Sequence, residues 1–391
     1  MTSEWNHFAL GEITELVIDY RGKTPKKLGG DWCKQGYRAL SAKNIKTGRI
    51  VQAETIRYID ESLYRKWMKD EVQRGDILIT SEAPFGQIFF WDSDEKIVLS
   101  QRLFCVRIKP EYDARFIYYY MTTPEFQSEL DGRATGTTVI GLRQPELMKC
   151  IIRCPEIQEQ KVIAAILSSI DAKIIANEKV NDNLADLLQT IYQERFVNDI
   201  LAVNQGVLSD ICSYSRDKVA VSELNIRTYF STENMLSGKA GSTEATSLPT
   251  TSQTTACHKG DTLISNIRPY FKKIVYCEDN CGCSTDVLCF TPSQPRYSAY
   301  LFSTLYADKF FAFMVAGSKG TKMPRGDKQQ IMTYPVVLPS EEALAGFNTI
   351  ASPLLEQIYS NRAENKRLSI LRDTLLPKLM SGEIDVSAVQ L

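Results

Sequence analysis

The chain has 391 residues and carries 46 Lys and Arg against 47 Asp and Glu, a formal net charge of −1. This length allows two or three domains with separate cores, and the balanced charge excludes a uniformly basic nucleic-acid binder. Ten dispersed cysteines favour reduced thiols. The sequence has neither an apolar run of membrane-spanning length nor a signal segment, so we expect a cytoplasmic protein.

Residues 1–155 mix strand and helix patterns. Short β-rich runs at Ile77–Thr80 and Leu103–Val106 are typical of buried strands. The aromatic stretch Phe116–Tyr120 is typical of a helix packed on a core. These residues predict a first mixed domain that ends at Pro155.

Residues 156–198 predict one long helix with a seven-residue repeat. The repeating core residues are Ile163, Ile170, Asn177, Leu184 and Ile191, and Ile166, Val180 and Leu187 supply the second core position. Five heptads with one polar core residue are typical of a coiled coil.

Residues 199–339 repeat the plan of the first domain. The run Arg74–Ile79 returns as Lys259–Ile264, shifted by 185 residues, and Ser100 returns as Ser284, shifted by 184. Nearer the start of each copy the shift is larger, so the first copy holds extra residues between shared anchors. Copies that keep their anchors and differ in their loops are expected to bind different targets.

Residues 340–391 predict a second long helix and a C-terminal tail. Its repeating core residues are Phe347, Leu354, Asn361, Leu368 and Leu375, with Ile350 and Leu371 at the second position. The fold class is therefore α+β: two similar mixed α/β domains are separated by two long helices that form an antiparallel coiled coil, in a pseudo-twofold internal repeat.

The antiparallel arrangement would place Asn177 beside Asn361, where paired amides satisfy each other in a buried seam. Two alternatives stay open. The helices would pack separately on their own domains, or both asparagines would lie at a solvated edge.

Motifs for catalysis are absent from the sequence. It has no Pro-Pro pair, which the target-amine motif of amino-methyltransferases needs, and no phosphate-loop or dinucleotide motif. His7 and His258 are the only histidines, too few for histidine-based schemes. The spacing of Cys277, Cys281 and Cys283 matches no usual zinc module, so we expect buried thiols, no metal and no bound cofactor.

Basic and small polar residues recur at matched places in the two mixed domains. Such residues bind phosphates or guanine edges, and Gly-Thr loops bring backbone amides close to phosphate. The candidate DNA-binding residues are Arg21, Lys23, Arg49, Arg133, Thr135 and Thr137 in the first domain and Arg216, Lys218, Lys239, Arg268, Lys319, Lys322 and Arg325 in the second. The alternative interpretation of each is an ordinary surface charge.

Two helical stretches resemble the specificity subunit of Type I restriction-modification systems. They are Cys154–Ile163 (CPEIQEQKVI), continuing toward Ile174, and Leu371–Ile384 (LRDTLLPKLMSGEI). Gly22-Lys23-Thr24-Pro25 and the two Gly-Asp-x-Leu-Ile strands are also similar to that family's target recognition domains. The resemblance covers almost the whole chain. The second copy departs from it at Ser340–Ala343, which leaves the start of the second helix open.

The resemblance implies target recognition domains at 1–155 and 199–339, each recognising one half of a bipartite, asymmetric site in double-stranded DNA. It implies spacer helices at 156–198 and 340–391 that dock two methyltransferase subunits, which bind S-adenosylmethionine. Restriction/translocase subunits that use ATP and Mg would complete the complex, and this chain itself would be non-catalytic.

Two other functions are compatible with parts of the sequence. A scaffold would assemble a DNA-modifying complex without recognising sequence. An independent nuclease or methyltransferase would be active as an isolated chain, and the missing motifs argue against it.

Overall fold

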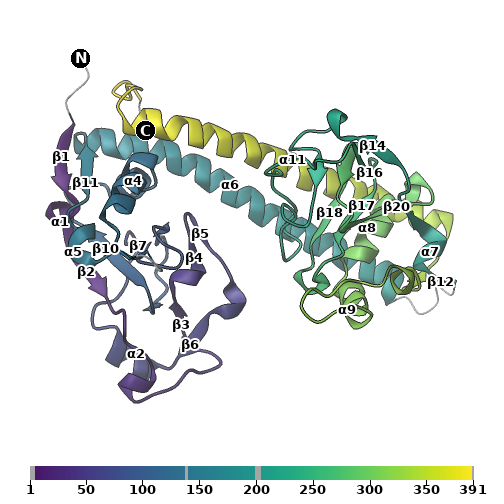
Figure 1. Cartoon of the computed structure of the whole chain (residues 1–391), viewed down its shortest axis with the longest axis horizontal. Coiled ribbons are helices and arrows are strands. Elements are labelled where there is room, and N and C mark those ends of the chain that lie inside the picture. The colour runs from purple at the N-terminus through teal and green to yellow at the C-terminus, as the bar shows by residue number, and fades with distance from the viewer. Residues whose placement is uncertain (1–4, 137–139, 199–203, 390–391) are drawn as a thin grey trace. The chain divides into compact units, whose positions relative to one another are not determined.

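The structure is a computed structural model that describes residues 5–136, 140–198 and 204–389 (Figure 1). Backbone contacts divide the chain into two units: unit 1 holds Met1–Ile174 and Lys366–Leu391, and unit 2 holds Ile175–Asn365. Both unit boundaries fall inside the long helices, so each unit contains a mixed α/β part and one segment of each helix.

Unit 1 is built around a four-stranded antiparallel sheet with the strand order β2-β10-β7-β8. In β7, Ile77 and Ile79 belong to one core cluster and Leu78 to another, so both faces of the sheet are buried. One face packs on α3, α4 and the start of α6, and the other on the small sheet β6-β3-β9. The strands of unit 1 are β1 (Asn6–Ala9), β2 (Thr14–Asp19), β3 (Tyr37–Leu40), β4 (Ile45–Lys46), β5 (Arg49–Ile50), β6 (Arg57–Ile59), β7 (Ile77–Thr80), β8 (Ile88–Phe90), β9 (Val98–Leu99), β10 (Leu103–Ile108) and β11 (Ile151–Cys154). Its short helices are α1 (Leu10–Ile13), α2 (Glu61–Trp67), α3 (Ala114–Met121), α4 (Pro124–Arg133) and α5 (Gln144–Leu147).

Unit 2 repeats this architecture. Its main sheet has the order β13-β20-β17-β18, and a second sheet has the order β14-β16-β19-β15. The parallel pair β3–β9 of unit 1 corresponds to the parallel pair β15–β19. The strands are β12 (Gln205–Val207), β13 (Cys212–Tyr214), β14 (Lys218–Ala220), β15 (Tyr229–Phe230), β16 (Gln253–Cys257), β17 (Thr262–Ser265), β18 (Ile274–Tyr276), β19 (Cys281–Cys283), β20 (Val287–Pro292) and β21 (Pro335–Val337). The helices are α7 (Leu208–Ile211), α8 (Ser298–Tyr306), α9 (Asp308–Ala316) and α10 (Lys328–Met332).

The repeat extends to single buried side chains. Asp76 accepts a hydrogen bond from the Gln73 backbone N–H at 2.8 Å, and Asp261 accepts one from the His258 N–H at the same distance. Both aspartates are 1% exposed. Each Gly-Asp motif therefore fixes the turn before a central strand, which explains why the motif occurs in both copies.

The predicted long helix after Pro155 is confirmed as α6 (Ile157–Tyr192), and a second long helix is α11 (Glu341–Met380). Five π-helical residues, Gln193–Val197, follow α6. Segments of α6 and α11 lie side by side in each unit (Figure 1). Among the described residues, none of the helices combines the length and apolarity needed to cross a bilayer.

The seven-residue repeat identified only part of the buried face. Ile163, Ile170, Asn177 and Asn361 are buried, and Leu184, Ile191, Leu354, Leu368 and Leu375 are half-buried. The predicted second core position is wrong in both helices. Val180 and Leu187 are 43% and 46% exposed, Ile350 and Leu371 are 36% and 46% exposed, and Ile166 is only half-buried.

The second core position lies one residue further along each helix. Leu167, Ile174, Asn181 and Leu188 fill it in α6, and Ala351 and Ile358 fill it in α11. An α-helix places the residues i+3 and i+4 on nearly the same face, and both are apolar at several of these points. Periodicity alone therefore did not separate them.

The predicted pairing of Asn177 with Asn361 is also wrong. Within unit 2, the Asn177 amide donates to Asn365 Oδ1 at 2.8 Å and to Glu364 at 2.7 Å, whereas Asn361 donates to Asn181 at 2.9 Å. Moving four residues forward in α6 thus corresponds to moving four residues back in α11, so these segments are antiparallel. The register differs from the prediction by one helical turn.

Candidate nucleic-acid interface

Three loops meet at one place in unit 1. The backbone N–H of Leu142 donates to the Ser81 carbonyl at 3.0 Å, which joins the segment just before α5 to the loop between β7 and β8. The Gly48 N–H donates to the Ile88 carbonyl at 3.1 Å, which adds the β4–β5 turn. We call this group the unit 1 loop cluster.

The same three loops meet in unit 2. The Gly326 N–H donates to the Asn266 carbonyl at 3.2 Å, and the Gly238 N–H donates to the Phe271 carbonyl at 2.8 Å. The pair Lys319 and Arg325 bridges this loop as Thr135 and Gly141 do in unit 1. We call this group the unit 2 loop cluster. Its equivalence to the first means that both copies present matched loops on matched frameworks.

Each unit has a pocket beside its loop cluster. The unit 1 pocket has a volume of about 270 Å³, and Ser41, Lys43, Arg57, Gln101 and Arg102 are among its lining residues. Arg102 pairs with Glu82 at 2.9 Å, and the Arg57 guanidinium lies 5.3 Å from the Trp32 ring centroid. The cationic side chains give this pocket donors for phosphate or base acceptors.

The unit 2 pocket has a volume of about 320 Å³, and Ser231, Glu233, Glu244 and Asp286 are among its lining residues. Asp286 pairs with Arg325 at 3.0 Å and Glu244 with Arg227 at 3.1 Å. Ser231 corresponds to Ser41, while Glu233 and Asp286 stand where the repeat has Lys43 and Arg102. The two pockets therefore occupy equivalent places and are lined by charged side chains of opposite sign, and Arg102, Asp286 and Glu244 among them are each paired with a residue of the other charge.

Three of the candidates predicted from sequence lie in or beside the unit 1 loop cluster. Arg21 donates to the Leu142 carbonyl at 3.3 Å, is held by Asp19 at 2.8 Å, and lies over the Phe104 ring. Thr135 is bridged to Gly141, and Arg49 belongs to β5.

Other candidates of unit 1 lie elsewhere or make contacts that support the fold. Lys23 donates to the Trp67 carbonyl at 2.8 Å, where burial lowers its pKa. Arg133 pairs with Glu129 at 2.9 Å within α4. Thr137 lies outside the described residues.

The unit 2 loop cluster includes five of the predicted residues. Lys239 pairs with Asp308 at 2.7 Å, Lys319 with Asp327 at 2.5 Å, and Arg325 with Asp286. The Arg268 N–H donates to the Pro324 carbonyl at 2.8 Å, and Lys322 is exposed in the same loop as Lys319.

The remaining two candidates of unit 2 lie at the β13–β14 connection. Lys218 is part of β14, where it is paired with Thr255 of β16, and Arg216 precedes this strand. These two residues therefore lie at the sheet that contains β14, whereas the β17–β18 loop belongs to the main sheet.

The residues that distinguish the two pockets were not predicted from the sequence. Lys43, Arg57 and Arg102 in unit 1, and Glu233 and Asp286 in unit 2, come from segments that lie far apart in the sequence. Arg102 has a positive φ of 66°, which is uncommon outside glycine. A comparison of charge at repeat-equivalent positions would have found the inversion.

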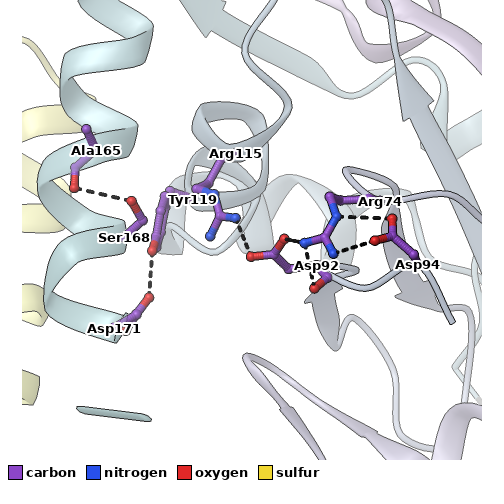
Figure 2. Close-up of polar contacts among 8 residues, drawn as sticks. All are labelled: Arg74, Asp92, Asp94, Arg115, Tyr119, Ala165, Ser168 and Asp171. Atoms are coloured by element: carbon purple, nitrogen blue, oxygen red, sulfur yellow. Dashed lines mark hydrogen bonds and ion pairs between the residues drawn. The ribbon is translucent and has the colours of Figure 1, made fainter. Parts of the chain in front are cut away.

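A polar network supports the framework of unit 1 (Figure 2). Arg74 pairs with Asp92 and Asp94, and Arg115 at the start of α3 pairs with Asp92 at 2.7 Å. The hydrogen bond from Arg115 lowers the pKa of Asp92. Tyr119 donates to Asp171 of α6 at 2.6 Å, so the sheet, α3 and α6 are tied together.

All ten cysteines have free thiols, and only Cys33 is exposed. Cys257, Cys277, Cys281, Cys283 and Cys289 share one small core, in which the Sγ atoms of Cys277 and Cys281 are 3.6 Å apart. In the part of the chain that the structure describes, no group of three or more His, Cys, Asp or Glu is arranged to hold a metal ion.

Comparison with known proteins relates this fold to one family. Residues 2–185 match the model of the Type I restriction modification DNA specificity domain. The chain is 28% identical over 187 residues to the Type I restriction enzyme MjaVIII specificity subunit of Methanocaldococcus jannaschii, an alignment that covers 46% of this chain and 43% of the relative. It is 22% identical over 373 residues to the MjaIX specificity subunit of the same organism, covering 80% and 78%.

A solved structure shares the fold over nearly the full length. The S subunit of a Type I restriction-modification system from M. genitalium is 17% identical, with a TM-score of 0.59 over 96% of both chains. The chain spans less than half of the first curated relative but most of the second. The first half of the chain is therefore similar in sequence to the DNA specificity domain of Type I restriction-modification systems, and the fold agrees with that of a solved S subunit.

Proposed function

We propose that the chain is the specificity subunit of a Type I restriction-modification system and that each unit recognises one half of a bipartite, asymmetric site in double-stranded DNA, in the cytoplasm. The observation that carries the proposal is the pair of equivalent loop clusters beside pockets whose charged lining side chains are of opposite sign. Arginine and lysine donate to guanine O6 and N7 or to phosphates, whereas Asp and Glu accept from the cytosine amino group. Two matched surfaces with opposite charge are suited to two different half-sites.

We further propose that α6 and α11 form an antiparallel coiled coil that sets the distance between the half-sites. The antiparallel contacts within each unit support this: Asn177 with Asn365 in unit 2, and Asp171 with Arg372 at 2.8 Å in unit 1. A fixed spacing makes the second half-site contact intramolecular, so the selectivities of the two units multiply.

Methylation and cleavage are assigned to partner subunits in this proposal. Two methyltransferase subunits would dock on the helices and supply S-adenosylmethionine, and restriction/translocase subunits would supply ATP- and Mg-dependent cleavage. The specificity subunit would contribute DNA binding and geometry. The sequence motifs for those reactions are absent from this chain.

A domain exchange tests the proposal. The chain is co-expressed with its methyltransferase subunit, residues 1–155 are replaced by the matching segment of a relative, and methylated motifs are mapped by genome-wide sequencing. We expect one half-site to change while the other half-site and the spacer stay. Replacement of residues 199–339 is the matched control and should change only the other half. A scaffold without sequence recognition would leave every motif unaltered in both exchanges, and would give no sequence-dependent DNA binding.

A further inference from the structure

The loop between β17 and β18 exposes two neighbouring aromatic rings. Tyr270 is 50% exposed and Phe271 is 38% exposed, and their ring centroids are 4.7 Å apart. Exposed apolar side chains are ordinary when single, but two adjacent rings at one loop form an apolar patch that needs an explanation.

The backbone of this loop is held in place by the turn that contains Gly238 and Lys239. The Phe271 carbonyl accepts from the Gly238 N–H at 2.8 Å, and the Lys272 carbonyl accepts from the Lys239 N–H at 2.9 Å. Lys239 and Lys272 also share Asp308, at 2.7 and 3.0 Å. The rings are therefore presented by a fixed loop, so little ordering is needed when they meet a ligand.

Unfavourable backbone conformations occur at both ends of the aromatic pair. Arg268 and Lys272 each have a φ of 51°, a backbone conformation that is unfavourable for residues other than glycine. At the equivalent end of the unit 1 loop the residue is Gly86, with a φ of 71°. Unit 2 thus keeps a lysine where unit 1 uses glycine, and such strain in natural proteins clusters at functional sites.

The unit 1 loop differs in its aromatic residue as well. Its Phe85 is partly buried against the main core of that unit, whereas Tyr270 and Phe271 stay in solvent. The aromatic patch is therefore a property of unit 2 and not of the shared framework. If the two copies bind different targets, the difference is expected to lie in residues that differ between their equivalent loops.

The surroundings of the rings are cationic. Arg268 precedes Tyr270 by two residues and is half-buried, and among the described residues its Nε is buried without a hydrogen-bond partner. Lys322 is exposed in the neighbouring 317–326 loop, whose Pro324 carbonyl accepts from Arg268. A planar apolar surface beside cationic side chains complements DNA, which offers base faces next to phosphates.

We propose that Tyr270 and Phe271 stack on, or wedge between, base pairs of the half-site that unit 2 recognises, while Arg268 binds the adjacent phosphate or base edge. This inference rests on the proposed function and adds a specificity-determining element to it. Apolar side chains that enter a base step partly unstack it, and easily deformed steps then bind best. Unit 2 would thereby select its half-site partly by deformability.

The test uses the chain assembled with its methyltransferase subunit and a duplex that carries the mapped motif. One base of the unit 2 half-site is replaced by 2-aminopurine, whose fluorescence rises on unstacking. We expect the wild-type complex to increase this fluorescence. The double substitution Tyr270→Ala and Phe271→Ala should abolish the increase and weaken binding roughly 5- to 150-fold, the range for loss of one base–aromatic stack.

Three controls separate the outcomes. Val207→Ala removes an exposed apolar side chain elsewhere in unit 2 and should change neither signal. When 2-aminopurine is placed in the unit 1 half-site instead, the wild-type and doubly substituted complexes should give the same change in fluorescence. Mass photometry of the complex checks assembly.

Unchanged affinity and fluorescence in the double variant would overturn the inference while leaving the proposed function intact. The inference would also be overturned if the double variant lost the methyltransferase subunit but still bound DNA, because the rings would then contact that subunit and not DNA. A wild-type complex without sequence-dependent binding would instead contradict the proposed function, and the inference with it.

Discussion

Asn361 donates a hydrogen bond from its side-chain amide to Asn181 Oδ1 at 2.9 Å, and both residues are nearly fully buried. The two residues come from antiparallel segments of α11 and α6 in unit 2. Gln357 donates to Asn361 Oδ1 at 2.8 Å, so the buried amide is bonded through both its nitrogen and its oxygen. Buried amides that are satisfied in this way fix the register of a helix pair.

Asn361→Ala should destabilise the chain because it leaves Asn181 Oδ1 buried without its donor. The expected loss is about 1–3 kcal/mol in the free energy of unfolding, measured by urea denaturation. The double change Asn181→Leu and Asn361→Leu removes donor and acceptor together and should recover most of the loss. A double variant less stable than Asn361→Ala would show that the pair is not the source of the effect.

Asp76 in unit 1 is 1% exposed and accepts two hydrogen bonds from Arg107, each at 2.9 Å. Arg107→Leu leaves a buried carboxylate without its cation, so we expect a loss of about 3–5 kcal/mol. Arg74→Ala is the matched control, because Arg74 is 52% exposed and pairs with exposed Asp92 and Asp94. Its effect should stay below about 1 kcal/mol. Equal losses in the two variants, in urea denaturation, would contradict this account.

The equivalent aspartate in unit 2 lacks an arginine partner. Thr291 stands where unit 1 has Arg107, and burial raises the pKa of Asp261 above its ordinary value. A carboxyl whose pKa is higher in the folded state stabilises the fold below its unfolded pKa, and this contribution is lost as the pH rises through the folded pKa. Raising the pH to neutral therefore removes stability that the Asp261 carboxyl contributes at low pH.

Asp261→Asn should consequently raise the melting temperature relative to wild type, and by more at pH 7 than at pH 4. Calorimetry at the two pH values measures this difference. Asp76→Asn is the matched control and should lower the melting temperature at pH 7, since Arg107 loses its ionic partner. If Asp261→Asn raised the melting temperature equally at pH 7 and pH 4, the charge of the carboxylate would not be the cause of the effect.

These side chains also show what sequence can predict and what it cannot. The internal repeat follows from matching residues at a nearly constant shift, and the long helix after Pro155 follows from the spacing of its apolar residues. The sequence was therefore sufficient to predict both. The choice between Ile166 and Leu167 depended on which of two adjacent apolar residues faces the neighbouring helix, and periodicity does not decide that. The unit 1 pocket is lined by residues such as Lys43 and Arg102, and strand pairing between distant segments brings them to the same pocket.

Arg102→Gln should alter recognition of one half-site only. A bidentate arginine–guanine contact accounts for about 1–3 kcal/mol of discrimination, so loss of the Arg102 guanidinium should relax the unit 1 half-site by that amount. Competition binding against duplexes with single-base changes measures it. Arg65→Gln removes a more exposed cation of α2 in the same unit and serves as the control. Relaxed recognition in the unit 2 half-site would assign Arg102 a different role.

Lengthening the helices tests the proposed spacer. Four residues inserted into both α6 and α11, next to the Asn177–Asn365 pair, add about 6 Å to each helix. This length corresponds to about two base pairs of DNA. An insertion of four residues unwinds a coiled coil only locally, so the helix pair should persist. Methylation mapping should then show both half-sites unchanged and a spacer longer by about one or two base pairs.

A four-residue insertion at Asp94, which is strongly exposed after β8, is the control and should leave the spacer as it was. Altered half-sites with a constant spacer in the helix variant would mean that α6 and α11 position the recognising loops and do not set the gap. If only the helix variant shows a longer spacer, the distance between the half-sites is set along α6 and α11. The reason is that the loops of both clusters are identical in that variant and in the wild-type chain.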